Sequence, residues 1–494
     1  MSRDERWRPR FHYTPARHWI NDPNGLVRLD GEYHLYYQHN PQGDRWGHMS
    51  WGHAVGRDLV DWHELPVAIP ETERVSIYSG SVVVDAANTS GFGAPGQAPL
   101  VAVYTGCRRR PEGGQAQELA YSVDRGRRWT PYAGNPVLDL GLRDFRDPKV
   151  FWHAETARWI MVVVVPDARR ARFYASPDLK AWTLLSDFGA PFEGEGIWEC
   201  PDLIPFELAG EGRIWMLKVD VFGGHPSGGT GARLFFGRFD GNTFTPEAET
   251  APRWADQGAD FYAALSFANL DADEAPVWLA WMNCHRYAQA LPTAPWRGAM
   301  TLPRRLALRR VEGRIELLQQ PVAELERLRG APVAAAAATI DGAGADLLGA
   351  AADAIAAGAD AGTFEVELAI EATAAARCGI AIECGDSSLR VGYDRARGAV
   401  YVDRSAAGWS PAGDELWGRC RHAACAAPAP GRPLRLRLWI DRSSIEVFAD
   451  AGQAVLTELR FPPAGPTRLH LNSEGGATAF GPTRIWPLRA AHID

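Results

Sequence analysis

Three acidic residues stand in similar local sequences, each just ahead of a proline. Asp22 and Asp147 are followed directly by proline, and Glu199 is followed by Cys-Pro. An aspartate before a proline usually forms a turn. Carboxylates brought together could instead hydrolyse a glycosidic bond, because that reaction needs one group to attack or to activate water and another to protonate the departing oxygen. A third carboxylate could stabilise the oxocarbenium-like transition state. The outcome depends on which elements position these acids.

Short apolar runs rich in β-branched and aromatic residues recur along the first part of the chain. Their central residues are spaced by 68, 60, 53 and 63 residues. A period of this size accommodates four strands of about 5–6 residues with their turns, which is one blade of a β-propeller. Five runs therefore predict five blades, and the alternative is a β-sandwich with accidental spacing. The central residues are Leu35, Val103, Val163, Met216 and Leu279.

A second mark follows most of these runs in phase. It consists of a strand, a turn acid, and then Trp or Phe a few residues later. We interpret each as a turn that joins two strands. The turn acids are Asp58, Asp124, Asp178 and Asp240.

Four acids occupy similar positions within the sequence repeat. Asp22, Asp147, Glu199 and Asp260 lie 13, 16, 17 and 19 residues before the central residues of runs one, three, four and five. The first strand of a propeller blade lines the central channel, so we expect these four side chains to converge at one channel mouth. The second blade contributes Tyr-Ser-Gly-Ser, residues 78–81, at a similar phase. Repeated phase therefore favours a shared site over isolated turns.

The neighbours of the acids suggest how they could be tuned. Arg146 could keep Asp147 ionised and bind sugar hydroxyls in a fork, although a structural ion pair is an equal alternative. Glu199 lies between Trp198 and Cys200, an apolar setting that suits a general acid. No histidine accompanies Cys200 at a suggestive spacing, so we interpret it as a packing or tuning neighbour rather than a nucleophile.

The composition favours a turn-rich β protein. The chain has 494 residues, of which 46% are hydrophobic, and this length predicts two domains. A net charge of -8 leaves no basic surface for nucleic acid. Gly, Pro and 19 tryptophans suit turns and an aromatic-lined site. Gln38, Trp46 and Trp281 could contact a sugar. For the two tryptophans, burial in the core is the default interpretation.

The seven cysteines form no Cys-x-x-Cys pattern and are not interleaved with histidines. We therefore expect neither a zinc site nor a disulfide framework, and the chemistry above needs no metal or organic cofactor. The N-terminus lacks the apolar core of a signal peptide, and no apolar run reaches about 18 residues. These features predict a cytoplasmic protein without a membrane partner, or a secreted one if a leader has been removed. They predict no oligomeric state.

The second half of the chain has a different pattern. Strands expected at 304–308 and 313–318 complete the fifth blade, so the propeller domain is predicted for residues 1–318. A connector with helical apolar spacing covers 319–330, and an Ala/Gly-rich stretch at 330–362 marks the change of domain. Apolar residues then alternate with period 2 at 364–368, 434–438 and 445–447. This pattern predicts a supporting β-sandwich over 331–494.

At these residues the chain resembles the family 32 glycoside hydrolases, which include invertases, inulinases and levanases. The principal motifs are Trp-Ile-Asn-Asp-Pro-Asn-Gly at 19–25, Phe-Arg-Asp-Pro at 145–148 and Glu-Cys-Pro at 199–201. Further similarity lies at 36–41, 51–54, 79–81, 295–300, 302–304 and 438–448. The resemblance spans nearly the whole chain. It implies an all-β fold, a five-bladed β-propeller followed by a C-terminal β-sandwich.

The resemblance also implies roles for single residues. Asp22 matches the nucleophile, Glu199 the general acid/base, and Asp147 a transition-state stabiliser that contacts fructose hydroxyls. Tyr78 stands where the family usually carries Phe, so its hydroxyl could alter the polar contacts of the pocket. Residues matching the fructose pocket are Asn21, Gln38, Trp46, Ser79, Arg146 and Asp260, and Cys200 and Trp281 complete the candidate substrate-binding set.

The predicted function is that of a retaining exo-β-fructofuranosidase, which releases fructose from the non-reducing end of levan, inulin, fructo-oligosaccharides or sucrose. Asp22 would attack the anomeric C2 while Glu199 protonates the leaving oxygen, and water activated by Glu199 would release fructose. Retention requires carboxyl groups about 5–5.5 Å apart. A fructosyltransferase using the same intermediate, an inverting hydrolase of arabinan type and a non-catalytic sugar-binding propeller are the alternatives. The sequence does not rank the substrates.

Overall fold

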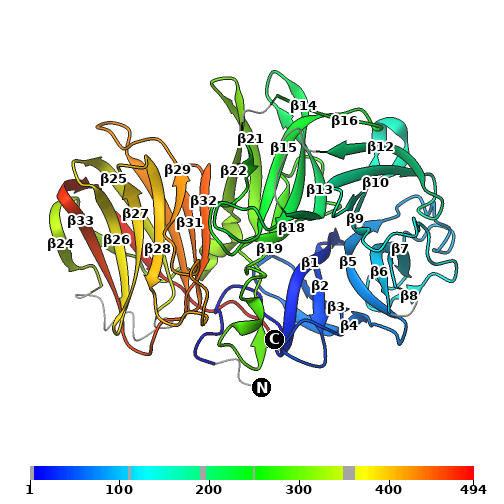
Figure 1. Ribbon diagram of the computed structural model, residues 1–494, viewed down its shortest axis with the longest axis horizontal. Coiled ribbons are helices and arrows are strands. Elements are labelled where there is room, and N and C mark those ends of the chain that lie inside the picture. The colour runs from blue at the N-terminus through cyan, green and yellow to red at the C-terminus, as the bar shows by residue number, and fades with distance from the viewer. Residues whose placement is uncertain (1–4, 110–112, 190–195, 249–250, 349–361) are drawn as a thin grey trace.

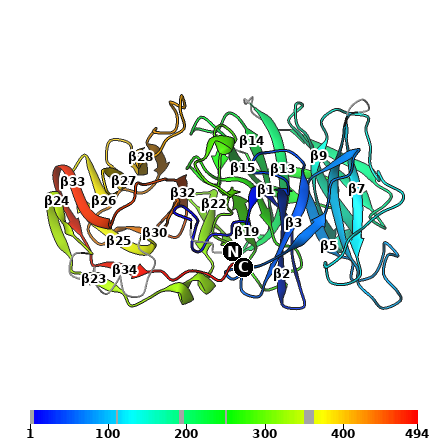
Figure 2. The same cartoon turned by 90° about the horizontal axis from the view of Figure 1, so that it is seen from below.

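The computed structural model describes residues 5–109, 113–189, 196–248, 251–348 and 362–494. The chain forms two β domains that lie side by side, a propeller and a β-sandwich (Figure 1). Both termini lie near the junction of the two domains (Figure 2). No helix in the described ranges is long and apolar enough to cross a membrane. The predicted fold class, a five-bladed β-propeller followed by a β-sandwich, is confirmed.

Each blade is an antiparallel sheet whose strands follow chain order from the axis outward. The innermost strands contact one another in a closed ring. Blade one contains β1 (His18–Leu29), β2 (Glu32–Asn40), β3 (Ser50–Gly56) and β4 (His63–Ile69), with β20 (Trp296–Arg297) parallel to β1. Blade two contains β5 (Val75–Val84), β6 (Leu100–Arg108), β7 (Gln115–Ser122) and β8 (Thr130–Pro131).

Blades three to five repeat this arrangement. Blade three contains β9 (Arg146–His153), β10 (Arg158–Val165), β11 (Arg170–Ser176) and β12 (Thr183–Gly189), with the 3-10 helix η1 (Ala154–Thr156) after β9. Blade four contains β13 (Ile197–Leu208), β14 (Gly212–Phe222), β15 (Gly231–Phe239) and β16 (Phe244–Pro246), and β17 (Arg253–Trp254) also pairs with β15. Blade five contains β18 (Tyr262–Ser266), β19 (Val277–Trp281), β21 (Arg304–Val311) and β22 (Arg314–Pro321).

The five apolar runs are the second strands of the blades, β2, β6, β10, β14 and β19. A second strand packs on a neighbouring blade through each of its faces, so it reads as a continuous apolar run rather than an alternating one. Separate apolar clusters fill the spaces between successive blades, and the cluster between blades five and one also includes sandwich residues. The repeat in the sequence is therefore the repeat of the blades.

The four turn acids join the third and fourth strands of blades one to four, as predicted. Each carboxylate accepts hydrogen bonds from backbone N–H groups of its own turn. Asp178 accepts from Lys180 and Ala181 at 2.9 Å, and Asp240 accepts from residues 242 and 243 at 2.8 Å. These bonds satisfy the backbone where the strand reverses, which explains an acid at this phase.

The junction between the domains lies close to the predicted connector. Strand β22 ends at Pro321, and the short 3-10 helix η3 (Ala323–Leu328) follows it. The Ala/Gly-rich stretch is more than a boundary, because β23 (Val333–Ala335) and β24 (Ala338–Asp346) already belong to the sandwich. The part of this stretch at 349–361 lies outside the described residues.

The second domain is a β-sandwich whose strands are hydrogen-bonded into one continuous sheet that encloses an apolar core. Alternating strands such as β30 turn their leucines inward and their arginines outward, as the period of 2 predicts. The remaining strands are β25 (Phe364–Thr373), β26 (Arg377–Cys384), β27 (Ser387–Asp394), β28 (Ala399–Ala406), β29 (Arg421–Ala424), β30 (Leu434–Asp441), β31 (Ser444–Ala449), β32 (Ala454–Leu459), β33 (Thr467–Phe480) and β34 (Thr483–Pro487).

Candidate active site

Each of the five innermost strands is interrupted by a β-bulge. The register shifts fall at residues 21–22, 78–79, 147–148, 200–201 and 263–264. A bulge changes the direction of the side chains beside it. Asp147, Cys200 and Ala263 adopt left-handed backbone conformations there, with φ of 65°, 45° and 54°. The repeated irregularity therefore turns residues from all five blades toward one place.

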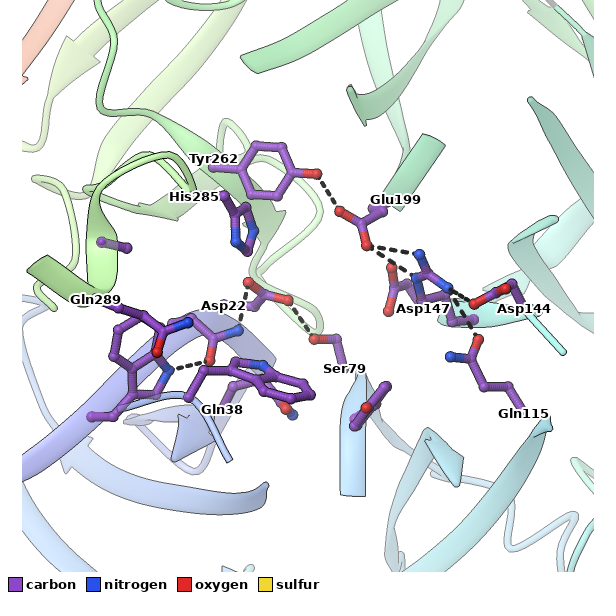
Figure 3. Close-up of a pocket in the computed structure, with 16 residues that line it drawn as sticks. Asp22, Gln38, Ser79, Gln115, Asp144, Asp147, Glu199, Tyr262, His285 and Gln289 are labelled. Carbon is purple, nitrogen blue, oxygen red and sulfur yellow. Dashed lines mark hydrogen bonds and ion pairs between the residues drawn. The ribbon is translucent and has the colours of Figure 1, made fainter. Parts of the chain in front are cut away.

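A cavity of about 350 Å³ opens at these bulges (Figure 3). Asp22, Asp147 and Glu199 all line it. The predicted pocket residues Asn21, Gln38, Trp46, Tyr78, Ser79 and Arg146 line it as well. The three carboxylates that are 125 and 52 residues apart in the sequence thus share one cavity.

Neutral donors hold the Asp22 carboxylate. Ser79 Oγ donates to Oδ2 at 2.6 Å, and Asn21 Nδ2 donates to Oδ1 at 3.0 Å. Trp19 Nε1 in turn donates to Asn21 Oδ1 at 2.7 Å, which fixes the orientation of the amide. Among the described residues no cationic side chain forms an ion pair with this carboxylate, an arrangement that suits a nucleophile.

The Glu199 carboxylate lies between a cation and a phenol. The Arg146 guanidinium meets Oε1 at 3.0 Å, and Tyr262 Oη donates to Oε2 at 2.5 Å (Figure 3). The apolar setting expected from Trp198 is wrong, because adjacent strand residues face opposite sides and Trp198 points into the core between blades three and four. Glu199 is thus held by two polar groups at the edge of the cavity.

Asp147 is buried, with 7% of its surface exposed. The Cys200 N–H donates to its Oδ2 at 2.8 Å. Burial raises the pKa of the Asp147 carboxyl well above its usual range; Arg146 opposes this shift, whereas the charges of Glu199 and Asp22 add to it. Arg146 thus acts on Asp147 in the expected direction, towards the ionised form, but does not outweigh the effect of burial. Its hydrogen bonds go to Glu199, Asp144 and Gln115.

The rest of the predicted pocket supplies an amide and two aromatic rings. Gln38 is buried, and its Nε2 has no hydrogen-bond partner among the described residues, so this donor remains available to a ligand. Trp46 is 48% exposed and meets the Tyr78 ring edge to face at 6.1 Å. The extra hydroxyl of Tyr78 contacts the Cys107 thiol, and burial raises the pKa of Tyr78.

Two sequence profiles of one family match nearly the whole chain. The N-terminal domain of the glycosyl hydrolases family 32 matches residues 12–321, and the C-terminal domain of that family matches residues 324–487. The chain belongs to glycosyl hydrolase family 32. The resemblance seen in the sequence motifs is thereby confirmed, and the protein is a glycoside hydrolase.

Relatives from bacteria and fungi match this chain over nearly its whole length. The levanase of Bacillus subtilis (strain 168) is 41% identical over 500 residues, which cover 98% of this chain and 71% of the levanase. The extracellular exo-inulinase of Aspergillus awamori is 36% identical over 513 residues, which cover 96% of this chain and 93% of the inulinase.

Solved structures of similar enzymes share the architecture. The crystal structure of the Aspergillus awamori exo-inulinase aligns with a TM-score of 0.90 at 34% identity, over 99% of this chain and 100% of that one. The fructofuranosidase of Schwanniomyces occidentalis complexed with fructose aligns with a TM-score of 0.85 at 29% identity, over 99% of each chain.

Three candidate residues of this family 32 enzyme do not line the cavity. The Cys200 thiol lies against the carboxylates, 3.6 Å from Asp22 Oδ2 and 3.5 Å from Asp147 Oδ2. Burial raises the pKa of this thiol, which disfavours the reactive thiolate. Cys200 therefore fits the role of a packing neighbour. Trp281 is fully buried against Trp19.

The third of these residues, Asp260, does not reach the cavity either, because its carboxylate is fully buried in an ion pair with Arg404 of the sandwich at 2.6 Å. Its expected place in the fructose pocket is therefore wrong.

Sequence reasoning missed Tyr262, although the signal was present. Tyr262 lies 17 residues before Leu279, the same distance that separates Glu199 and Arg146 from the central residues of their own blades. A search restricted to carboxylates passes over a phenol at that position. The other lining residues not foreseen are Trp19, Gln115, Asp144, His285, Ala288 and Gln289.

Proposed function

We propose that this glycoside hydrolase is a retaining, exo-acting β-fructofuranosidase. Its substrates are levan, inulin, fructo-oligosaccharides or sucrose, from which it removes the fructose at the non-reducing end. The observation that carries the proposal is the cavity in which Asp22 and Glu199 are each oriented by their own hydrogen-bond donors. The similarity to a levanase and an exo-inulinase supports the fructoside specificity.

The cavity suits a chain end. Its volume of about 350 Å³ is at the small end of the range for ligand pockets. Buried side chains of the innermost strands, including Lys149, Cys200 and Asp202, fill the propeller axis. A polymer cannot thread through such a site, so its terminal residue enters from the mouth.

The chemistry proceeds in two displacements. Asp22 attacks C2 of the fructosyl unit while Glu199 donates its proton to the departing oxygen, which leaves a fructosyl ester on Asp22. Glu199 then takes a proton from water, and the water oxygen attacks C2 and releases Asp22. Asp147 supports both steps through contacts with fructose hydroxyls, and Arg146 and Tyr262 keep Glu199 directed at the reacting bond.

Product analysis tests the proposal directly. The purified chain is incubated with sucrose, a short fructo-oligosaccharide, inulin and levan, and the products are followed by NMR. We expect free fructose whose first-formed anomer retains the β configuration. An inverted anomer would exclude the double displacement, transfer products in place of fructose would identify a fructosyltransferase, and no turnover of any of the four would leave a sugar-binding propeller.

Substitution of the two carboxylates tests their roles. Glu199→Gln should lower kcat by about 10²–10⁴-fold, the range typical of a lost acid/base catalyst, and Asp22→Asn should lower it at least as far because no covalent ester can form. Asp187→Asn changes a half-exposed carboxylate on β12 that pairs with Arg172 of β11. It is the matched control and should retain activity. Circular dichroism checks folding. Wild-type turnover in either site variant would refute the assignment.

A further inference from the structure

One segment of blade five faces both the cavity and the β-sandwich. It joins β19 to β20 over residues 282–295 and contains the 3-10 helix η2 (Ala288–Ala290). On one side His285 and Gln289 line the cavity. On the other side the Tyr287 side chain is buried against the sandwich, with its ring 4.8 Å from that of Trp417. The position of this segment therefore depends on a contact with the second domain.

The contact centres on Arg404 at the end of β28. Its guanidinium donates to Asp260 Oδ2 at 2.6 Å and to the Tyr287 hydroxyl at 3.0 Å. Tyr287 Oη in turn donates to Asp260 Oδ1 at 2.6 Å, which closes a three-membered ring of hydrogen bonds. The side chains of Arg404 and Asp260 have no exposed surface.

The sandwich holds Arg404 itself in place. Its Nε donates to the Trp417 carbonyl at 2.9 Å and lies 2.8 Å from Glu458 Oε2. One Nη donates to the Leu459 carbonyl at 3.0 Å, and the guanidinium stacks over the Trp417 ring at 3.7 Å. A charge that is buried and fully paired in this way resists displacement, because any movement would leave it unpaired away from water.

Asp260 links this arginine to the acid/base residue. It lies two residues before Tyr262, whose hydroxyl donates to Glu199. The Tyr262 ring also meets the His285 ring edge to face, with centroids 5.1 Å apart. The blade-five wall of the cavity consists of two strips of chain, one carrying Tyr262 and the other carrying His285. Each strip is thus hydrogen-bonded to the Arg404 guanidinium, the first through Asp260 and the second through Tyr287.

We propose that Arg404 is a positioning residue for the active site and that the β-sandwich holds the blade-five wall of the cavity through it. The proposal rests on the proposed function, since that wall meets the substrate. It assigns the second domain a part in substrate binding although none of the sandwich side chains that the structure describes lines the cavity. Loss of the contact displaces the wall and weakens binding of the fructoside.

A second buried arginine provides a matched control. Arg304 also bridges the domains, pairing with Glu446 of the sandwich at 2.6 Å and with Asp256 at 3.0 Å, and it too is fully buried. None of these three residues lines the cavity or lies within two residues of one that does. If interdomain arginines only join the domains, Arg304→Lys and Arg404→Lys should behave alike.

The experiment compares these two variants in the full chain. Arg404→Lys should raise KM for a short fructo-oligosaccharide by about tenfold with a smaller change in kcat, because displacement of a positioned wall acts on binding. Arg304→Lys should lower the melting temperature but leave KM unchanged. Hydrogen exchange measured by mass spectrometry should become faster at 260–266 and 282–290 in Arg404→Lys alone.

Two further variants cover the case in which Arg404→Lys does not fold. Tyr287→Phe removes one hydroxyl and keeps the Arg404–Asp260 ion pair, and it should raise KM and accelerate exchange at 282–290. Tyr13→Phe is its control, because it removes a buried hydroxyl that bonds Tyr37 at 2.8 Å, away from the cavity lining.

The outcomes separate this inference from the proposed function. Equal KM and equal exchange in the Arg404 and Arg304 variants, or in the Tyr287 and Tyr13 variants, would overturn the positioning role. A wild-type chain that releases no fructose would refute the proposed function alone. The exchange measurements would then still decide whether Arg404 holds the two strips of the wall.

Discussion

The two carboxylates at the centre of the proposed mechanism are prepared by different partners. Asp22 accepts hydrogen bonds from a hydroxyl and an amide, so neutral groups orient it. Glu199 is bound by a guanidinium and a phenol, which hold its side chain in one orientation. At the scale of single residues, the difference in donors therefore matches the difference between a nucleophile and an acid/base catalyst.

The burial of Asp147 predicts a pH-dependent stability. Because the folded state raises the pKa of this carboxyl, the folded protein binds the proton more tightly than the unfolded chain does. Its contribution to stability is full below the ordinary aspartate pKa of about 3.9 and is lost as the pH rises through the raised folded value. Asp147→Asn, which cannot ionise, should therefore gain in melting temperature relative to the wild type as the pH rises from 4 towards neutrality.

Scanning calorimetry at several pH values between 4 and 8 measures this difference. Asp187→Asn, with its half-exposed carboxylate, serves as the control and should follow the wild-type curve. A difference between Asp147→Asn and the wild type that is constant across the range would contradict the raised pKa.

At the scale of the strand, a backbone N–H in a β-bulge forms the shorter of the two contacts that Cys200 makes with Asp147 Oδ2. The Cys200 N–H that binds Asp147 belongs to the bulge of β13, and Lys218 Nζ donates to the Cys200 carbonyl at 2.5 Å from the next strand. The left-handed φ of 45° at Cys200 costs energy in a residue other than glycine. The local strain is retained because it directs this N–H at a carboxylate.

Two substitutions at Cys200 separate the backbone from the thiol. Cys200→Ala keeps the N–H and should leave kcat/KM within about tenfold of the wild type. Cys200→Val places a β-branched residue in the left-handed region and should lower the free energy of unfolding by about 1–3 kcal/mol, with a further loss of activity as the N–H moves. Urea unfolding and steady-state kinetics measure both effects. Equal behaviour of the two variants would show that the bulge geometry is not essential.

The repeat made much of this site predictable. Blades three to five have the same distance between the bulge and the centre of the next strand, so Arg146, Glu199 and Tyr262 all lie 17 residues before their central residues. The phase therefore places Glu199 and its two partners in one row. Asp260 stands 19 residues ahead of Leu279, and these two extra residues carry it out of the cavity and into the interface with the sandwich.

Two other lining residues and one partner were not predictable from the repeat, because they depend on segments that do not repeat. His285 and Gln289 lie in the connection from β19 to β20, which has no counterpart of equal length in the other blades. The partner of Asp260 is 144 residues away in another domain. Periodicity describes elements, whereas contacts of this kind depend on how whole domains pack.

At the scale of the whole molecule, the N-terminal segment ties the two domains together. His12 is fully buried, with Nδ1 2.8 Å from Asp441 and Nε2 3.0 Å from Glu446. Burial alone would lower the pKa of His12, but hydrogen bonds and charge interactions with the two carboxylates raise it to about 9. The protonated ring therefore bridges two acids of the sandwich from a segment that packs on blade one.

This bridge predicts a loss of stability in alkaline solution. The folded state raises the pKa of His12 above 6.5, so its contribution is full below pH 6.5 and is lost as the pH rises through about 9. A shift of this size corresponds to about 3 kcal/mol. The wild-type melting temperature should fall over that range, and the fall should be smaller in His12→Gln. A wild-type curve that parallels that of His12→Gln would contradict the prediction.

The bulges shared by the five blades have a consequence for laboratory evolution. The same backbone irregularity carries amide and carboxylate in blade one, phenol and hydroxyl in blade two, and guanidinium, carboxylate or phenol at its edge in the others. The scaffold therefore tolerates different functional groups at equivalent sites. A combinatorial library at these bulge positions, with Asp22, Asp147 and Glu199 kept, should vary substrate selectivity with little loss of folded protein, whereas mutations spread over the strand interiors would mostly unfold the protein.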